Sequence, residues 1–95
     1  MHIITRKRLI EFTKKHPDCF SAIESWYRIV KRTDFNSFAE LRHAFPGADK
    51  VANLTIFNVG GNKARLIAAI HYNKRRIYIR HVLTHKEYDR GSWRK

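Results

Sequence analysis

The sequence contains one cysteine, Cys19, which excludes an internal disulfide. Acidic residues are also scarce, since eight Asp and Glu stand against 20 Lys and Arg and leave a formal charge of +12. No stretch approaches the roughly 20 apolar residues that span a bilayer, and the segment MHIITRKRL lacks an apolar core of signal-peptide length. We therefore expect a soluble cytoplasmic protein that binds a polyanion: nucleic acid, an acidic membrane surface or an acidic protein.

Motifs of several enzyme classes are missing. The chain has no Gly-x-Ser-x-Gly nucleophile motif, and Gly60-Gly61 lacks both the Walker pattern and a following helix. The few carboxylates lie mostly in predicted helices, which disfavours a mechanism based on paired carboxylates. A zinc site needs three or four convergent nitrogen or sulfur ligands, and His71 and His81, on neighbouring predicted strands, need not face the same way. We expect neither a metal nor another cofactor.

The composition fits one small folded domain spanning residues 1–95. A hydrophobic fraction of 43% is sufficient for a modest core, and a chain of this size buries roughly two-thirds of its unfolded surface. The charge is uneven along the chain. Residues 1–62 hold ten basic and six acidic side chains, a balance of +4, whereas residues 63–95 hold ten and two, a balance of +8. Most of the positive field therefore belongs to the last third of the sequence.

Apolar residues at helical spacing predict two helices in the first third of the chain. Thr5 can cap the first, which ends at about His16 because a proline follows. Asp18 is the expected N-cap of the second helix, over residues 19–32. Its predicted inward residues are Phe20, Ile23, Tyr27 and Val30.

Two segments have the Ser/Thr-x-x-Glu form of a capping box, in which the two side chains satisfy free backbone donors reciprocally. Ser37 to Glu40 precedes a short helix over residues 38–44. Thr84 to Glu87 precedes a helical turn over residues 85–90 that Gly91 ends. The tail Ser92-Trp93-Arg94-Lys95 is basic with one aromatic ring, and it is either frayed or an extension of a nucleic-acid contact.

Four strands are expected. They span residues 2–4, at an edge or in the centre of a sheet, and then residues 54–59, 63–72 and 76–83. The turns between the last three are Gly60-Gly61-Asn62 and Asn73-Lys74-Arg75, while residues 49–53 are expected to be a polar approach to the sheet. Alternation in the last strand puts Ile77, Ile79, His81 and Leu83 on one side. We assign Arg65 and Arg80 to the same open face of the sheet, that is, the face that the helices do not cover.

Cationic and titratable residues gather in the second half of the predicted sheet and in the cap that follows. They are Lys63, Arg65, Arg80, His85, Lys86 and Tyr88. Such a set is either a solvated basic face or a site that cleaves RNA without a metal. In RNA the 2′-OH beside the scissile phosphate is the nucleophile, so an enzyme has to orient it, move two protons and neutralise the phosphate. Arg offers planar donors to phosphate, His carries protons at neutral pH, and Tyr or Lys can carry the second proton when nearby cations lower its pKa.

Four segments together resemble HigB-type toxins of bacterial type II toxin–antitoxin pairs, within the RelE-like superfamily. They are MHIITRKRL, FAELRHAFPGADKV, FNVGGNKARLIAAI and YIRHVLTHKEYD, and the last two are specific only in combination. The resemblance runs nearly end to end and implies a RelE-like α+β domain over residues 1–95. The implied element order is β-α-α-β-β-β, with a mainly antiparallel sheet, helices packed on one face and a short C-terminal helical turn.

The resemblance also implies an endoribonuclease, an mRNA interferase that cuts translated messages in the ribosomal A site. A HigA-type antitoxin would silence it, and the toxin would reach operator DNA only indirectly, through the antitoxin complex; we expect no membrane partner. Matching residue by residue, the family's site falls on Arg65, His85, Lys86 and Tyr88, and we expect catalysis there. We expect RNA binding by Lys63, Arg76, Arg80 and Arg90. Family members differ in which side chain is the general base, so the choice between His85 and Tyr88 stays open.

Two other functions remain as alternatives. A non-catalytic RNA or ribosome binder on the same fold would depend on charge and would not need His85. Direct DNA binding is disfavoured, because no predicted helix combines a basic exposed face with a dimer seam.

Overall fold

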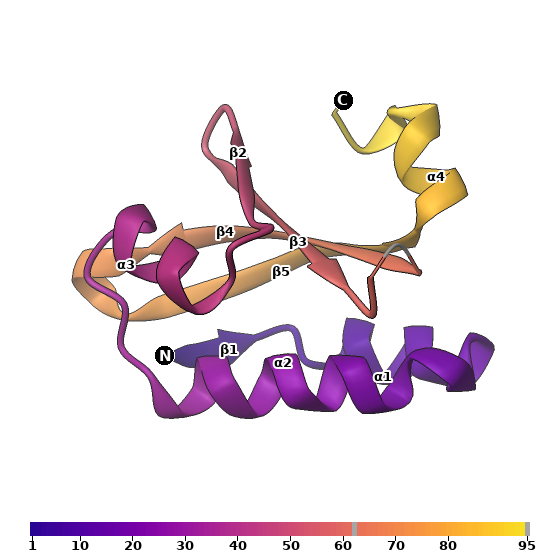
Figure 1. Cartoon of the computed structure of the whole chain (residues 1–95), viewed down its shortest axis with the longest axis horizontal. Coiled ribbons are helices and arrows are strands. Elements are labelled where there is room, and N and C mark those ends of the chain that lie inside the picture. Colours follow the sequence, from indigo (N-terminus) through magenta and orange to yellow (C-terminus); the bar gives the residue numbers. More distant parts are fainter. Residues whose placement is uncertain (62, 95) are drawn as a thin grey trace.

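The strands of the protein form one sheet, in which the first strand of the chain is followed in space by the fifth, fourth, third and second. A computed structural model describes residues 1–61 and 63–94 (Figure 1). Asn62 of the predicted turn and Lys95 of the tail lie outside the described residues. The strands are β1 (His2–Ile4), β2 (Asp49–Val51), β3 (Leu54–Val59), β4 (Ala64–His71) and β5 (Arg76–Thr84). The helices are α1 (Lys7–Lys15), α2 (Phe20–Arg32), α3 (Phe38–Ala44) and α4 (His85–Arg90), with short 3₁₀ turns at Pro17–Cys19, Tyr72–Lys74 and Ser92–Arg94.

The sheet is mainly antiparallel, as predicted, and the fold is α+β. Only β1 runs parallel to its neighbour, and it lies at the edge beside β5. The other edge strand, β2, pairs Asp49 with Ile56 and contradicts the expected polar approach over residues 49–53. Two of its three residues, Asp49 and Lys50, are exposed. A solvent-facing edge strand of this kind has no apolar alternation to reveal it.

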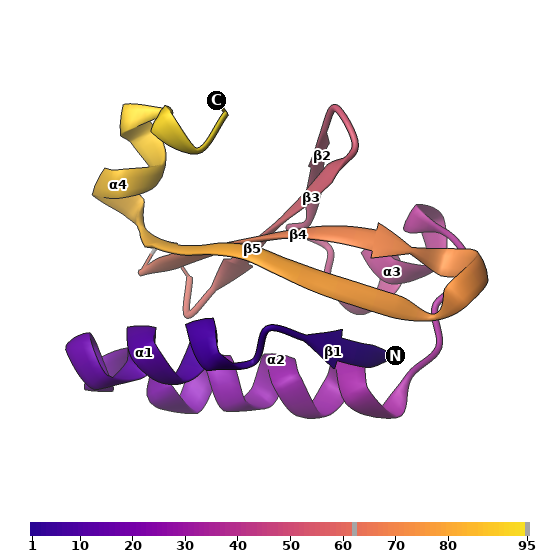
Figure 2. The same ribbon diagram turned by 180° about the vertical axis from the view of Figure 1, so that it is seen from behind.

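Helices α1 and α2 pack on one face of the sheet, and Figures 1 and 2 show α4 on its other side, toward which the tip of the β2–β3 hairpin bends. The core between helices and sheet includes Trp26 of α2, which is 3% exposed, and Phe57 of β3. Their rings meet edge to face at 5.3 Å, a favourable aromatic geometry. This packing confirms the prediction that helices pack on one face of the sheet.

The helix starts differ from the prediction. Thr5 has φ 72 and does not cap α1, which begins after Arg6 without a side-chain cap. Asp18 lies inside the 3₁₀ turn, so Cys19 precedes α2. Phe20, the first residue of α2, is 54% exposed, so its predicted inward position was wrong, whereas Ile23 and Val30 are buried as predicted. Cys19 is a buried free thiol, and burial, followed by the nearby Asp18 carboxylate, raises its pKa.

The start of α3 confirms half of its predicted capping box. Ser37 accepts a hydrogen bond from the backbone N–H of Glu40, as an N-cap should. The Glu40 carboxylate, however, accepts from the backbone N–H of Asn36, one residue before the cap.

In the turn between β3 and β4, Gly60 and Gly61 both have positive φ, which glycine adopts without the steric cost of a Cβ.

A β-bulge interrupts the alternation of β5. Ile67 pairs with His81, whereas the next residue of β4, Ala68, pairs with Ile79, so Arg80 is the extra residue on β5. Ile77 and Ile79 therefore belong to the helix-side core, while His81 and Leu83 lie on the opposite face. The prediction that all four share one side was wrong.

The helices within residues 1–61 and 63–94 include none with the length and apolar character of a membrane span.

Candidate active site

Helix α4 is fixed at both ends by local interactions. Thr84 Oγ1 accepts from the backbone N–H of Glu87 at 3.2 Å, and the Glu87 carboxylate accepts from the backbone N–H of Thr84 at 2.9 Å. This bond from the Thr84 backbone holds the pKa of Glu87 below its usual value, with His16 and Arg90 adding a smaller effect. Gly91 ends the helix at φ 74. The predicted capping box, helical turn and stop are all confirmed.

Arg65 extends from β4 and contacts His85, the first residue of this helix. It is only 7% exposed, and its backbone pairs with Leu83 at the end of β5. One guanidinium nitrogen donates to the carbonyl of Ala64 at 3.3 Å, and the other lies 3.2 Å from Nδ1 of His85. The guanidinium carbon is 5.5 Å from the centre of the Tyr88 ring. The structure thus brings together Arg65, His85 and Tyr88, three of the four residues at which catalysis is predicted, and we call them the catalytic cluster for that prediction.

The contacts of His85 define its tautomer. Arginine only donates hydrogen bonds, so Nδ1 of His85 must accept from Arg65 and carry no proton. The proton of the neutral ring then sits on Nε2, which lies 3.4 Å from Oδ2 of Asp89 one helical turn later. Asp89 was not among the predicted site residues, although the His-x-x-x-Asp spacing in a helix is a readable signal.

Trp93 closes the cluster from the side of the tail. Its ring stacks on Tyr88 at 5.1 Å with an angle of 13°, and its indole N–H donates to the Tyr88 carbonyl at 3.0 Å. It is 5% exposed and packs with Ile56 and Ile67 on the open face of the sheet. The backbone of 92–94 forms a 3₁₀ turn. Within these residues the structure contradicts the frayed alternative, because Trp93 is a packed element of the site.

The other predicted site residues are spread more widely. Lys86 and Arg90 are exposed on α4, on either side of Tyr88 in the sequence. Lys63 lies near the helical layer, with its ammonium 3.8 Å from Asp18. Arg80 is exposed at the bulge, and Arg76 is at the opposite end of β5 from the cluster. The bulge interrupts the alternation from which Arg80 was assigned to the same face as Arg65, so that assignment stays a prediction.

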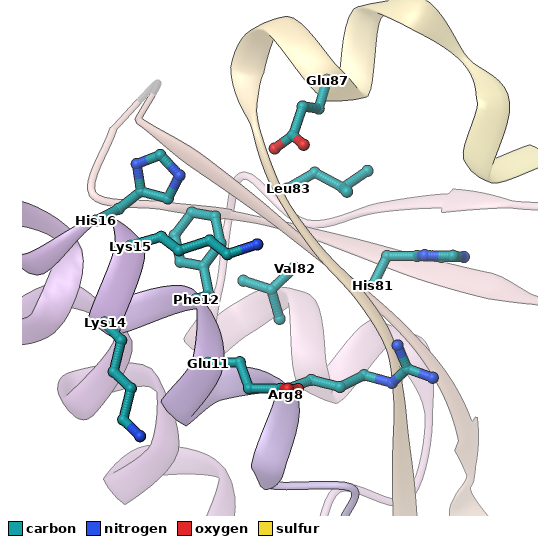
Figure 3. A pocket seen from close by; sticks show the side chains of 10 residues that line it. All are labelled: Arg8, Glu11, Phe12, Lys14, Lys15, His16, His81, Val82, Leu83 and Glu87. Carbon is teal, nitrogen blue, oxygen red and sulfur yellow. The ribbon is translucent and has the colours of Figure 1, made fainter.

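A groove of about 550 Å³ runs between α1 and the C-terminal half of β5 (Figure 3). Its walls include Arg8 and His16 from the α1 side, His81 and Leu83 from β5, and Glu87 from α4. Burial lowers the pKa of the His81 imidazole, and Arg8 and Arg80 add to this effect. Neither His16 nor His81 was predicted as a site residue. The groove exists because α1 lies beside β5, a tertiary contact that no local motif encodes.

Two comparisons with known proteins now identify the family. The protein-family model HigB_toxin, described as the RelE-like toxic component of a toxin–antitoxin system, matches residues 19–91. This chain belongs to the HigB toxin family. The "mRNA interferase HigB" of Escherichia coli O6:H1 (strain CFT073) is 40% identical over 93 residues, covering 95% of this chain and 90% of the relative. The "mRNA interferase toxin HigB" of Escherichia coli K12 is 35% identical over 92 residues, covering 94% and 88%.

Membership of the HigB family confirms the resemblance predicted from the four segments and the RelE-like fold expected with it. The matched range, 19–91, includes all three members of the catalytic cluster and ends two residues before Trp93.

Proposed function

We propose that this HigB-family toxin is an mRNA interferase, an endoribonuclease that cuts messages by attack of the 2′-OH without a metal. Residues 1–95 act as one domain. The observation that carries the proposal is the convergence of a nearly buried guanidinium, an imidazole and a phenol at the end of β5. Two curated relatives that share most of the chain are named mRNA interferases, which supports the same reaction here.

The first role belongs to Arg65. Its guanidinium matches the planar geometry of a phosphate and stabilises the extra negative charge as the 2′-oxygen attacks. A bound phosphate competes with Nδ1 of His85 for the same donors, since the two lie only 3.2 Å apart. Binding of RNA therefore draws Arg65 toward the phosphate and releases the lone pair of His85.

The released Nδ1 takes the proton of the 2′-OH as a new bond forms from the 2′-oxygen to phosphorus. Asp89 faces Nε2 and stabilises the imidazolium that results. The bond from phosphorus to the 5′-oxygen breaks, and the Tyr88 hydroxyl supplies the proton that this oxygen needs. The products are a 2′,3′-cyclic phosphate and a free 5′-OH. Lys86, with Lys63, Arg76, Arg80 and Arg90, contributes positive field and grip on the RNA backbone.

Membership of a toxin–antitoxin family implies an antitoxin as partner. We infer that it is of the HigA type, that the messages cut are those in the ribosomal A site, and that the protein acts in the bacterial cytoplasm. Contact with operator DNA is then indirect, through the antitoxin complex. The +12 charge suits a partner made largely of RNA, which the ribosome is.

The chemistry is tested with a synthetic message in a reconstituted translation system. The cut sites are first mapped, and the ribose that supplies the 2′-OH at one of them is then replaced by 2′-deoxyribose. We expect cutting to stop at that site and to continue at the others, with a cyclic phosphate on each upstream product. Continued cutting at the deoxyribose would refute attack by the 2′-OH.

The second candidate is a non-catalytic ribosome binder on the same fold. It is favoured by cations that lie apart from the catalytic cluster, such as the exposed Arg75 and Arg76. It predicts that His85→Asn leaves toxicity unchanged, whereas neutralising Arg75, Arg76 and Arg80 together abolishes it. The nuclease proposal predicts that His85→Asn alone abolishes toxicity.

A further inference from the structure

The open face of the sheet carries a second feature besides the catalytic cluster. The strand registers align one residue from each of the five strands in a single row across this face. The members of this row are Ile4, Tyr78, Ala69, Leu54 and Val51, and we call it the apolar row. Four of them are partly exposed, and Ala69 at the centre is 8% exposed.

The neighbours of the row in the sequence show which way it faces. Ala68, Ile70, Ile77 and Ile79 pack with the helix-side core. Successive side chains of a strand point to opposite faces, so Ala69 and Tyr78 point away from α1 and α2. This is the face on which Leu54 and Val51 contact the cluster of Ile56, Ile67 and Trp93.

Tyr78 is the aromatic member of the row and has a defined orientation. Its ring meets that of His71 edge to face, with centres 5.2 Å apart and an angle of 83°. Its partner across the strand pair is Ala69, whose methyl group is too small to cover a neighbouring ring. A flat ring beside a small residue on an open sheet is a surface on which nucleobases stack.

On one side, the apolar row is flanked by basic residues. The next row toward the β4–β5 turn consists of His71, Arg76 and His2. Asp49, paired with Ile56, is an acidic residue one row away in the other direction, at the far edge of the sheet. Ala69 lies four residues along β4 from Arg65, or about 13 Å at the rise of a β-strand. An RNA strand lying along β4 reaches both places.

We propose that the apolar row binds a nucleobase of the RNA strand that is cut at the catalytic cluster, with Tyr78 as the stacking platform. This inference rests on the proposed function and adds a binding subsite to it. Arg76, which lies far from Arg65, then holds a phosphate beside the stacked base. Loss of the base at a single position of the RNA should therefore weaken binding, and only when Tyr78 is present.

The experiment measures binding of a short, fluorescently labelled single-stranded RNA by anisotropy. Every ribose carries a 2′-O-methyl group so that the probe cannot be cut, and single bases are removed one position at a time. For the wild type, we expect one abasic position to lose about 5- to 150-fold in affinity, the effect of one stacked base. Tyr78→Ala should bind the intact probe as weakly as the wild type binds that abasic probe, and should lose nothing further with it.

Tyr78→Phe keeps the ring and should keep the profile. Tyr27→Ala is the matched control, since it removes a tyrosine from α2 in the helical layer. A wild-type profile with no sensitive position, or an unchanged profile in Tyr78→Ala, overturns the proposal. If the wild type cuts messages but no single missing base weakens RNA binding, the subsite is refuted and the nuclease proposal stands. If one missing base weakens binding as expected but no message is cut, the nuclease proposal is refuted and the subsite stands.

Discussion

Removal of the Thr84 hydroxyl tests whether the position of α4 governs catalysis. Thr84→Ala deletes the acceptor for the Glu87 backbone N–H, a change that costs about 0.5–2 kcal/mol at an N-cap. Helix α4 has six residues, and isolated helices shorter than about 12 residues are marginal. A loss of 1 kcal/mol lowers the ratio of formed to frayed α4 about 5-fold. Because α4 carries His85 and Tyr88, we expect the rate of message cutting to fall with the fraction of molecules in which α4 is formed, by up to about 5-fold.

Ser37→Ala is the control for this variant, because Ser37 caps α3 through a bond of the same length, 3.2 Å, to the backbone N–H of Glu40. It removes an equivalent cap far from the catalytic cluster. Cutting rates in a reconstituted translation system and melting curves are measured for both variants. Thr84→Ser should restore cutting. The reasoning is refuted if Ser37→Ala slows cutting as much as Thr84→Ala, or if Thr84→Ala cuts at the wild-type rate.

Three other changes have distinct expected outcomes. Arg65→Lys should abolish cutting while circular dichroism shows an intact fold, since an ammonium cannot replace the planar donors of a guanidinium. Trp93→Ala should destabilise the protein by about 3–5 kcal/mol, because a buried ring that stacks on Tyr88 is lost, and chemical denaturation should detect it. The lowered pKa of Glu87 adds stability above the pKa of an unfolded Glu, and this stability disappears as the pH falls through the lower folded pKa. The difference in melting temperature between wild type and Glu87→Gln should therefore shrink on acidification; a difference that stays constant would argue against this assignment.

Local sequence signals predicted the parts of the fold that depend on near neighbours. The capping box at Thr84, the stop at Gly91 and the strand of residues 54–59 all follow from patterns a few residues long. The start of α2 was wrong because Pro17 and the two residues after it form a 3₁₀ turn before the helix. Strand β2 was missed because an exposed edge strand lacks apolar alternation.

Part of the candidate site was predicted from the sequence, and part of it was not. Arg65, His85 and Tyr88 were expected from the family resemblance, and the geometry brings them together. The bulge at Arg80 could not be read from alternation, because one extra residue changes the face of everything after it. Burial of Trp93 depends on contact with Ile56 and Ile67, and such a contact between distant segments leaves no pattern in either.

The most direct test of the central claim is primer extension on a reporter message, with wild-type protein and Arg65→Ala compared in a translating system. We expect in-frame, translation-dependent cuts with the wild type and none with Arg65→Ala, whose melting curve should show that it is folded. Cuts that persist unchanged in the folded Arg65→Ala variant would contradict the assignment of catalysis to the Arg65, His85 and Tyr88 cluster. Arrested translation without any cuts by the wild type would instead establish the non-catalytic ribosome binder.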